Sequence, residues 1–434
     1  MRDAAAEAHV VESLLGRHLY LADGSRIYDL PPGYDDIDAL LAELAPESGR
    51  RIGDIPLAPP PLQTLSLNVA QACNMACGYC YADEGKFGAK ARTMAPEVAR
   101  AAVDRLFSES RPDQDLVIGF MGGEPLLARA LIREVTDYAR ARARSGRRRV
   151  RFSLTTNATL LRAEDAAFFA ENDFQIAVSI DGPRAANDAA RPLVSGSGSY
   201  DRIVAALALF ETHGRPRHLS ARATVTPRSG DLGGTLDHLI GLGFDSVGFS
   251  PVLVSPDPKY AFTRADFDAF CAAMIACGRT AKAALLAGAR YPFSNFETAL
   301  HELHRGSHRP YPCGAGAAYL SVDAEGDLYA CHRLVGDAGH LMGSVTQGSD
   351  TAARAAHLAR RHVDKQEPCR SCWARYLCGG GCYHEVDRRG RPACDYIRAW
   401  LEFCIGAYVE ILDAAPEYFS ASARTVRSLQ GEPA

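Results

Sequence analysis

Three cysteines, Cys73, Cys77 and Cys80, lie close together in the stretch CNMACGYC, separated by three and then two residues. Cysteine thiolates are the usual ligands of iron–sulfur clusters, and a full cluster takes four of them. Three thiolates on one short loop therefore leave one iron without a protein ligand, and that iron can bind a small molecule. A closed zinc site would need a fourth ligand, so the spacing favours an open iron–sulfur site.

A second group of seven cysteines lies nearer the C-terminus, in the order C…GxxxxC…CxxCxxxxxCxxxC…C. Its members are Cys313, Cys331, Cys369, Cys372, Cys378, Cys382 and Cys394. The chain has 13 cysteines, and its opening MRDAAAEAHV has no apolar signal segment. Clustered cysteines in such a chain indicate metal ligands in a reducing compartment, not disulfides. We expect a cytoplasmic protein, because no continuous apolar run approaches the roughly 20 residues of a membrane helix.

Alternating strands and helices are predicted from residue 63 to about 288. The six predicted strands are Thr64–Gln71, Leu116–Met121, Val150–Thr156, Gln175–Ile180, Ser220–Thr226 and Ser246–Leu253. Each is followed by a helical pattern, which indicates a parallel α/β fold. The cysteine loop follows the first strand, and in barrels of this kind active sites lie on the loops after the strands.

Polar residues and glycines stand at the ends of the next strands. They are Gly122-Gly123-Glu124-Pro125 after the second strand, Thr155-Thr156-Asn157 at the third, Ser179, Asp181 and Gly182 at the fourth, and Arg222 and Thr224 on the fifth. Paired glycines let a backbone approach a ligand closely.

The CxxxCxxC spacing, with Tyr79 before the last cysteine, resembles the radical S-adenosylmethionine (SAM) superfamily. The resemblance implies a partial (β/α)6 TIM-type barrel, and a [4Fe–4S] cluster on Cys73, Cys77 and Cys80 that binds SAM. Tyr79 is then expected near the adenine, and the GGEP element (Gly122, Gly123, Glu124, Pro125) at the amino group of SAM. Contacts to the ribose and methionine parts are expected from Thr156, Asn157, Ser179, Asp181 and Arg222. For Arg222 and Thr224 on the fifth strand, the alternative is that their side chains face a packed core.

The C-terminal cysteine order resembles the SPASM domain of radical SAM peptide maturases. The resemblance implies one auxiliary [4Fe–4S] cluster fully held by Cys369, Cys372, Cys378 and Cys394. A second auxiliary cluster is implied on Cys313, Cys331 and Cys382, which makes three clusters in all. With three thiolates it has an open iron for a substrate thiolate, unless Cys404 or Cys277 is the fourth ligand. We expect these two and Cys271 to be buried free thiols on helices.

The residue after Cys331 sets this chain apart from relatives that modify sulfatases. In those relatives an aspartate at that place acts as a base, whereas this chain has His332. Formylglycine formation is therefore disfavoured. His332 titrates near neutrality and is a candidate catalytic proton acceptor; the alternative is a supporting role beside the cluster.

Among SPASM proteins, the stretches CNMACGYCYADEGKFG, PYPCGAGA and EPCRSCWARYLCGGGCYHEV look most like the maturation enzymes of quinohemoprotein amine dehydrogenase. This resemblance implies Cys-to-Asp/Glu thioether cross-links within a small protein or peptide substrate. Two alternatives stay open. One is other SPASM chemistry, either carbon–carbon cross-linking or side-chain oxidation, and the other is a non-enzymatic iron–sulfur electron-transfer protein.

The predicted domains are an N-terminal extension, 1–62, the barrel, 63–288, the SPASM domain, 289–420, and a tail, 421–434. The extension contains a hairpin, His18–Leu30, and a helix, Ile37–Leu44; it is either a packing cap or a docking surface for a peptide.

The net charge of −4 gives no reason to expect nucleic acid or a membrane as partner. The basic run 140–151 is expected to be solvated. A flavodoxin or ferredoxin is the expected reductant.

Overall fold

The structure, a computed structural model, describes residues 7–23, 26–44, 52–306 and 309–420. The chain forms two compact units. The barrel unit comprises Leu57–Thr263 and Gly314–Leu358, and the terminal unit comprises Met1–Pro56, Arg264–Cys313 and Ala359–Ala434. These units do not coincide with the domains predicted from the sequence, because each is assembled from separate stretches. The predicted tail, 421–434, lies outside the described residues.

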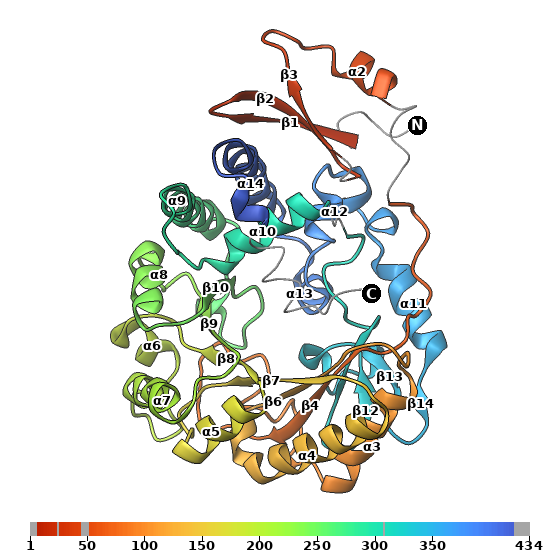
Figure 1. Ribbon diagram of the computed structural model, residues 1–434, viewed down its shortest axis with the longest axis vertical. Coiled ribbons are helices and arrows are strands. Elements are labelled where there is room, and N and C mark those ends of the chain that lie inside the picture. The colour runs from red at the N-terminus through yellow and green to blue at the C-terminus, as the bar shows by residue number, and fades with distance from the viewer. Residues whose placement is uncertain (1–6, 24–25, 45–51, 307–308, 421–434) are drawn as a thin grey trace. The chain divides into compact units, whose positions relative to one another are not determined.

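The barrel unit is built on a sheet whose six strands follow one another in chain order and run parallel (Figure 1). The strands are β4 (Thr64–Gln71), β6 (Leu116–Gly122), β7 (Val150–Thr156), β8 (Gln175–Ser179), β9 (His218–Val225) and β10 (Ser246–Pro251). The predicted parallel α/β fold is confirmed, with strand ends that differ from the prediction by at most two residues.

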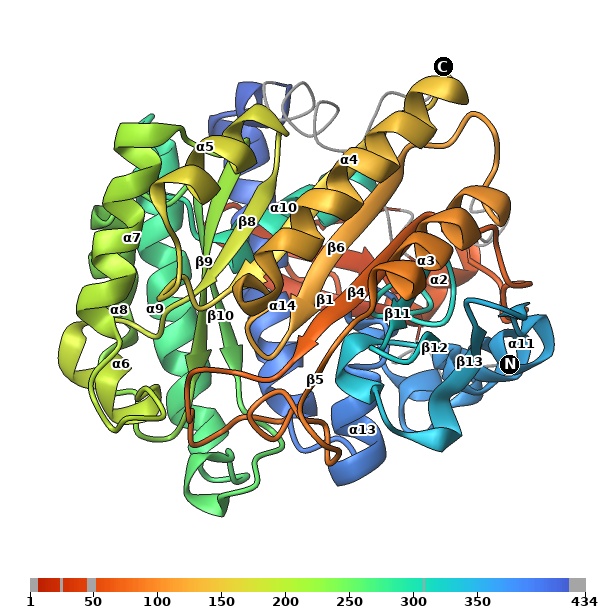
Figure 2. The same cartoon turned by 90° about the horizontal axis from the view of Figure 1, so that it is seen from below.

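Helices connect these strands. They are α3 (Pro96–Ser108), α4 (Arg129–Ser145), α5 (Ala163–Glu171), α6 (Arg184–Ala190), α7 (Tyr200–His213) and α8 (Leu232–Gly241). Figure 2 shows α3 and α4 side by side; α3 contacts β4 and β6, α4 contacts β7, and both helices bury apolar residues. Helix α6 was not predicted; its short sequence, RAANDAA, has no amphipathic period to reveal it.

Alternation along β9 separates an apolar face from a polar one. Leu219, Ala221, Ala223 and Val225 are buried, while Ser220, Arg222 and Thr224 between them keep access to solvent. Strands β7 and β8 alternate in the same way. Since side chains on a strand point to opposite faces in turn, the open face of the sheet is polar and presents Ser179 and Arg222.

The sheet continues beyond β4 into strands that the sequence did not indicate. Strand β11 (Tyr319–Val322) pairs parallel with β4, and β12 (Asp327–Tyr329), β13 (Leu341–Ser344) and β14 (Gly348–Ser349) extend it antiparallel. A two-residue strand, β5 (Arg92–Thr93), pairs with the end of β4. These strands have two to four residues each, too few for a hydrophobic period to be recognised.

The terminal unit contains a three-stranded antiparallel sheet, β1 (Ala8–Ser13), β2 (Gly16–Leu21) and β3 (Ile27–Leu30). The predicted hairpin is therefore confirmed as β2 and β3, and β1 was missed. Helix α2 (Ile37–Leu44), as predicted, packs its apolar residues against this sheet. The unit also contains α9 (Asp266–Leu286), α10 (Ser294–Arg305), α12 (Arg375–Cys378), α13 (Tyr383–Arg389) and α14 (Cys394–Ala414), while α11 (Thr351–Arg361) runs from one unit into the other.

Helices α9 and α14 pack against each other and bury the three cysteines that belong to neither cysteine group. Cys271 and Cys277 lie on α9 and Cys404 on α14, and all three side chains are buried on helices, as predicted. Whether Cys277 or Cys404 is a cluster ligand stays a prediction. Helix α9 is long and apolar enough to span a membrane, a property that buried helices of soluble proteins share, and a third of its apolar window is buried. Localisation therefore stays a prediction.

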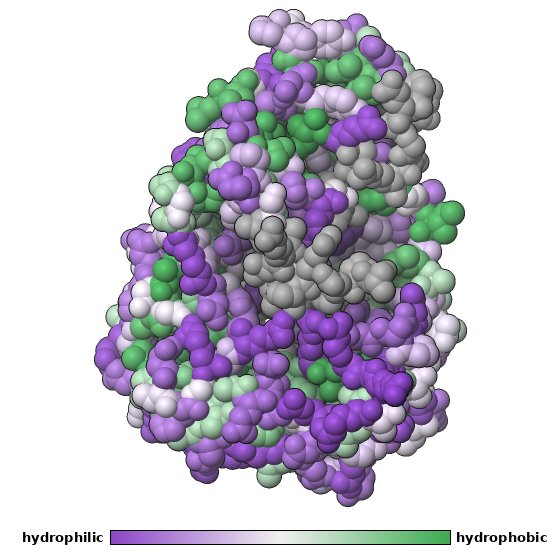
Figure 3. All heavy atoms as spheres, viewed as in Figure 1, coloured by the Kyte–Doolittle hydropathy of each residue, from purple (hydrophilic) through white to green (hydrophobic). Residues whose placement is uncertain are grey.

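The basic run 140–151 pairs with neighbouring acidic residues in the structure. Arg142 lies 2.8 Å from Asp104, and Arg149 and Arg151 lie 2.9 and 3.1 Å from Asp115. Figure 3 shows mainly hydrophilic side chains on the surface around α3 and α4. Local ion pairs account for these arginines, in agreement with the expected solvated surface.

Candidate functional site

The three cysteines of the first group lie on the loop after β4, and we call residues 72–88 the cluster loop. Their thiols are half-buried and free, and they influence one another electrostatically. The backbone N–H of Met75 donates to Cys73 Sγ at 3.4 Å. Burial raises the pKa of Cys73 to about 12 and also raises the pKa of Cys77. Binding of a metal cluster must therefore release thiol protons. Three thiols on one loop are the ligand type that an iron–sulfur cluster takes, although no three candidate ligands among the described residues lie as a group that could hold a single metal ion.

A second segment, residues 190–194, braces the cluster loop through its backbone. Gly78 N donates to Ala190 O at 3.1 Å, Ala76 N to Pro192 O at 2.9 Å, and Val194 N to Asn74 O at 3.1 Å. We call this segment the brace. It pairs with the loop as an irregular antiparallel ladder, so the positions of the cysteines depend on a segment more than 100 residues away in the chain.

Glycines allow the turn after β6 to lie directly on the cluster loop. A Cβ atom at Gly123 would stand 2.2 Å from Ala72 O, and one at Gly122 would stand 2.3 Å from Ala70 O. The φ angle of Gly122 is +139°, a conformation that L residues with side chains rarely adopt. The predicted GGEP element is therefore packed against the loop of the first cysteines, backbone to backbone.

Glu124 is fully buried and ties this turn to the end of β7. Its carboxylate accepts from Thr156 Oγ1 and Asn157 N, both at 2.7 Å, and from Leu126 N at 3.0 Å. Burial raises the pKa of Glu124, and the three donors oppose this shift. Since these donors belong to the protein, Glu124 and Thr156 position the backbone of the site.

Asn157 links the end of β7 to the cysteine loop. Its side-chain amide donates to Asn74 Oδ1 at 3.0 Å and lies 3.8 Å from Cys73 Sγ. Hydrogen bonds to cluster sulfurs and their thiolates tune iron–sulfur potentials. The structure thus places this predicted cofactor residue beside a candidate cluster ligand.

Tyr79 and Asp181 form a buried hydrogen-bonded group with Arg191. Tyr79 Oη donates to Asp181 Oδ2 at 2.5 Å and accepts from Arg191 Nη1 at 2.6 Å. Thr224 N donates to Asp181 Oδ1 at 2.9 Å. Sequence reasoning missed Arg191, which belongs to the brace; an arginine before a proline in a loop carries no recognisable signal.

Ser179 and Arg222 stand opposite each other in the register of β8 and β9. Arg222 keeps access to solvent, yet desolvation by the surrounding protein lowers the pKa of its guanidinium. No described residue pairs with that guanidinium. An unpaired cation on the polar face of the sheet is suited to an anionic group.

His332 lies next to Cys331 at the β11 side of the sheet. Its Nδ1 is 3.0 Å from Tyr319 Oη and 3.7 Å from Cys331 Sγ, and Tyr319 Oη lies 2.8 Å from Ser66 Oγ. The ring of Tyr81, the residue after Cys80, faces His332 with the ring centroids 6.3 Å apart. The structure therefore brings the residues that follow Cys80 and Cys331 together.

The terminal unit gathers four of the C-terminal cysteines. Cys369 is influenced electrostatically by Cys372, Cys378 and Cys394, with Arg391 as the neighbouring cation. Burial raises the pKa of Cys369 to about 11. These are the four residues predicted to hold one auxiliary cluster completely.

The second predicted auxiliary set is divided between the units. Cys313 and Cys382 belong to the terminal unit and both influence Tyr383 there, whereas Cys331 belongs to the barrel unit. The three-thiolate cluster on these residues stays a prediction.

Comparison with known proteins finds a family model that matches part of the barrel unit. Residues 67–250 match the model of the Radical SAM superfamily. A serine-type anaerobic sulfatase-maturating enzyme of Klebsiella aerogenes is 24% identical over 346 residues, 77% of this chain and 83% of that enzyme. An uncharacterized protein of Archaeoglobus fulgidus is 25% identical over 358 residues, 78% of this chain and 79% of that protein.

Two solved structures share the fold. Native anSMEcpe with bound AdoMet superposes with a TM-score of 0.70 at 20% identity, over 81% of this chain and 100% of that one. SuiB of Streptococcus suis bound to precursor peptide SuiA gives a TM-score of 0.53 at 13% identity, over 90% and 98% of the two chains. The fold of this chain is thus the α/β radical SAM fold.

Proposed function

We propose that this radical SAM enzyme modifies a ribosomally made peptide or a small protein subunit by forming Cys-to-Asp/Glu thioether cross-links. The observation that carries the proposal is the gathering of Cys369, Cys372, Cys378 and Cys394 in a chain whose barrel carries a second, three-cysteine loop. A maturase needs both groups, one for SAM and one for electrons. The sulfatase-maturating enzyme and SuiB, whose names or structures refer to protein or peptide substrates, are similar to this chain over most of its length.

The proposal assigns a [4Fe–4S] cluster and SAM to the cluster loop and two further clusters to the C-terminal cysteines. When bound, the cluster and SAM supply a 5′-deoxyadenosyl radical that removes a hydrogen atom from the substrate. The chain's own residues then have three tasks. Glu124 and the glycine turn hold the cluster loop in place. The hydrogen bond from Tyr79 to Asp181 ties the loop to the end of β8. The polar face of the sheet receives the methionine part of SAM.

Thioether formation is preferred over formylglycine formation because of His332. The sulfatase-modifying pattern has an aspartate at this place, and an imidazole beside Cys331 with a hydrogen bond to Tyr319 is a different proton acceptor. His332 remains our candidate for accepting a substrate proton.

Arg222 is proposed to bind the methionyl carboxylate of SAM. Replacing it by Met should weaken SAM binding about tenfold to a hundredfold, because a hydrogen bond to a charged group contributes about 1.5–3 kcal/mol. Equilibrium dialysis with labelled SAM on the reconstituted enzyme measures this. The control Ser220→Ala, two residues earlier on the same face of β9, should leave the affinity unchanged. Equal affinities of the Arg222→Met variant and wild type would exclude this contact.

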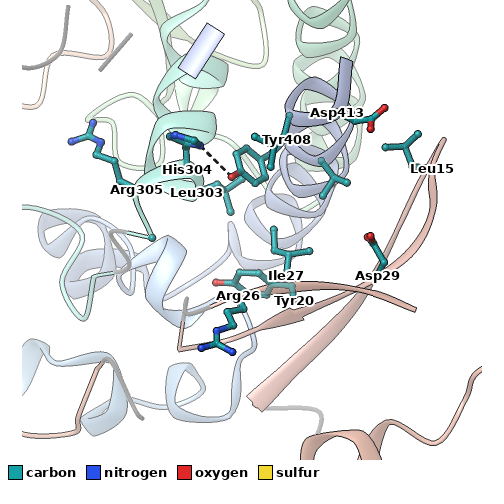
Figure 4. A pocket seen from close by; sticks show the side chains of 13 residues that line it. Leu15, Tyr20, Arg26, Ile27, Asp29, Leu303, His304, Arg305, Tyr408 and Asp413 are labelled. Carbon is teal, nitrogen blue, oxygen red and sulfur yellow. Dashed lines mark hydrogen bonds between the residues drawn. The ribbon is translucent and has the colours of Figure 1, made fainter. Parts of the chain in front are cut away.

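The N-terminal extension is proposed to dock an extended segment of the substrate. Strand β3 ends the order β1-β2-β3, so its second edge has no strand partner among the described residues. Beside it a cavity of about 760 Å³ opens between β2, β3 and the helices α10 and α14 (Figure 4). Its lining includes Ile27, Leu303, Leu412 and Leu15, and Leu15 is 52% exposed. An unpaired strand edge next to apolar side chains is suited to strand addition by a peptide.

Charged substitutions in this cavity test the docking. The variant Leu15→Asp/Leu412→Asp changes two exposed side chains, so its fold should survive. We expect KM for the peptide to rise at least tenfold, while SAM cleavage without peptide stays at the wild-type rate. Leu286→Asp, an exposed leucine on α9 outside the cavity lining, is the matched control. An unchanged KM would make the extension a packing cap.

A further inference from the structure

Arg191 is a buried cation in the segment whose backbone is hydrogen-bonded to the cluster loop. It is 6% exposed, and its Nη1 donates to Tyr79 Oη at 2.6 Å. Among the described residues its Nε–H has no hydrogen-bond partner. The guanidinium is also the charged group with the largest influence on the thiol of Cys77. A buried N–H donor without a partner, next to a candidate cluster ligand, indicates that the arginine faces the cluster site.

Arg191 interacts with two kinds of acidic group. Asp181 lies 4.0 Å away, and the phenol of Tyr79 bridges the two by accepting from Arg191 and donating to Asp181. The thiol of Cys77 also interacts electrostatically with the guanidinium. A buried guanidinium is costly unless its charge is compensated, and Asp181 is itself 6% exposed and held by Thr224 N. Asp181 and Cys77 therefore share one neighbouring cation.

We propose that Arg191 and Asp181 together set the reduction potential of the cluster on the cluster loop, Arg191 raising it and Asp181 lowering it. Reduction adds one negative charge to the cluster. A nearby buried cation stabilises that added charge and a nearby buried anion destabilises it, and net charge is one of the determinants of iron–sulfur potentials. The inference rests on the proposed cluster at Cys73, Cys77 and Cys80.

The backbone brace makes this electrostatic role specific to the loop. The hydrogen bonds from Gly78 N to Ala190 O and from Ala76 N to Pro192 O fix the backbone on both sides of Arg191. The backbone of Arg191 is thus held against the cluster loop by main-chain contacts that do not involve its side chain. Substituting the side chain changes the charge and leaves these contacts in place.

Two variants with opposite expected signs test the proposal. In Arg191→Gln the cluster should become harder to reduce, by at least tenfold in the reduced-to-oxidised ratio at a fixed potential, which is about 59 mV for a one-electron couple. In Asp181→Asn the ratio should change in the opposite direction. A purely structural role would loosen the loop in both variants and could not give opposite signs.

The measurement is an anaerobic redox titration of the reconstituted holoenzyme followed by electron paramagnetic resonance. The component whose line shape changes on addition of SAM reports the cluster on the loop. Arg184→Gln, an arginine seven residues earlier whose side chain is 59% exposed, is the matched control and should give the wild-type potential. Arg191→Lys keeps the charge and should stay closer to wild type than Arg191→Gln does.

Shifts of the same sign, or none, in Arg191→Gln and Asp181→Asn overturn the inference. If Arg191→Gln loses iron, its potential cannot be measured, and the test passes to Arg191→Lys and Asp181→Asn. The inference still requires that the reduction potential of the cluster rises in Asp181→Asn. A wild-type enzyme without any SAM-responsive component would instead overturn the proposed cluster assignment, and this inference with it.

Discussion

Replacing Cys73, Cys77 and Cys80 together by Ala should abolish SAM cleavage and lower the iron content from about twelve to about eight per chain, four for each [4Fe–4S] cluster. The cysteines that remain for two clusters lie more than 200 residues further along the chain, and four of them gather in the other compact unit. Their clusters should therefore assemble without the first. Iron and sulfide analysis, together with chromatography of 5′-deoxyadenosine after reduction, measures both effects.

The matched control removes the other three cysteines. Cys271, Cys277 and Cys404 are buried on α9 and α14, and their joint replacement by Ala should keep all twelve irons and the cleavage activity. Loss of about four irons in this control would identify Cys277 or Cys404 as a cluster ligand. Loss of all iron in the first variant would mean that the two units do not acquire their clusters independently. Four irons in the wild type, with SAM cleavage intact, would contradict the auxiliary clusters.

Cross-linked substrate should be lighter by two hydrogens for each thioether formed. In the proposed reaction, one hydrogen would leave the carbon of an acidic side chain as an atom and appear in 5′-deoxyadenosine. The other would leave the substrate thiol as a proton, and the electron released by C–S bond formation would replace the electron used to cleave SAM. SAM would then be the net oxidant. Co-expression of the enzyme with neighbouring small open reading frames, followed by mass spectrometry, identifies the substrate and measures the loss.

Substrate with Ser in place of the reacting Cys should still support SAM cleavage but give no cross-link. The alcohol is a poor ligand and nucleophile at neutral pH, whereas a metal-bound thiol is deprotonated. Deuterium placed on the acidic side chain should appear in 5′-deoxyadenosine with both substrates. A Ser substrate that loses two hydrogens would favour carbon–carbon cross-linking or side-chain oxidation. Absence of SAM cleavage in the holoenzyme would leave electron transfer as the function.

The sequence by itself determined which features lie next to each other along the chain. The spacing of Cys73, Cys77 and Cys80 is local, so it predicts one loop with three thiols. The six strands are long enough for their period to be visible, and β4 and β7 have the predicted bounds. The polar residues at strand ends follow from the same periodicity, because parallel strands bring their carboxyl ends to one edge of the sheet.

Only the tertiary structure decided which distant residues meet. Arg191 reaches Tyr79 and Asp181 because the brace pairs with the cluster loop, and that pairing joins stretches more than 100 residues apart. Strand β11 joins β4 across some 250 residues through four register pairs. Such contacts depend on the sum of many small packing and hydrogen-bonding energies over the whole fold, whereas strand and loop signals are carried by a few consecutive residues. For this reason the three thiols of the cluster loop could be recognised in the sequence, whereas the buried guanidinium of Arg191 next to the loop could not.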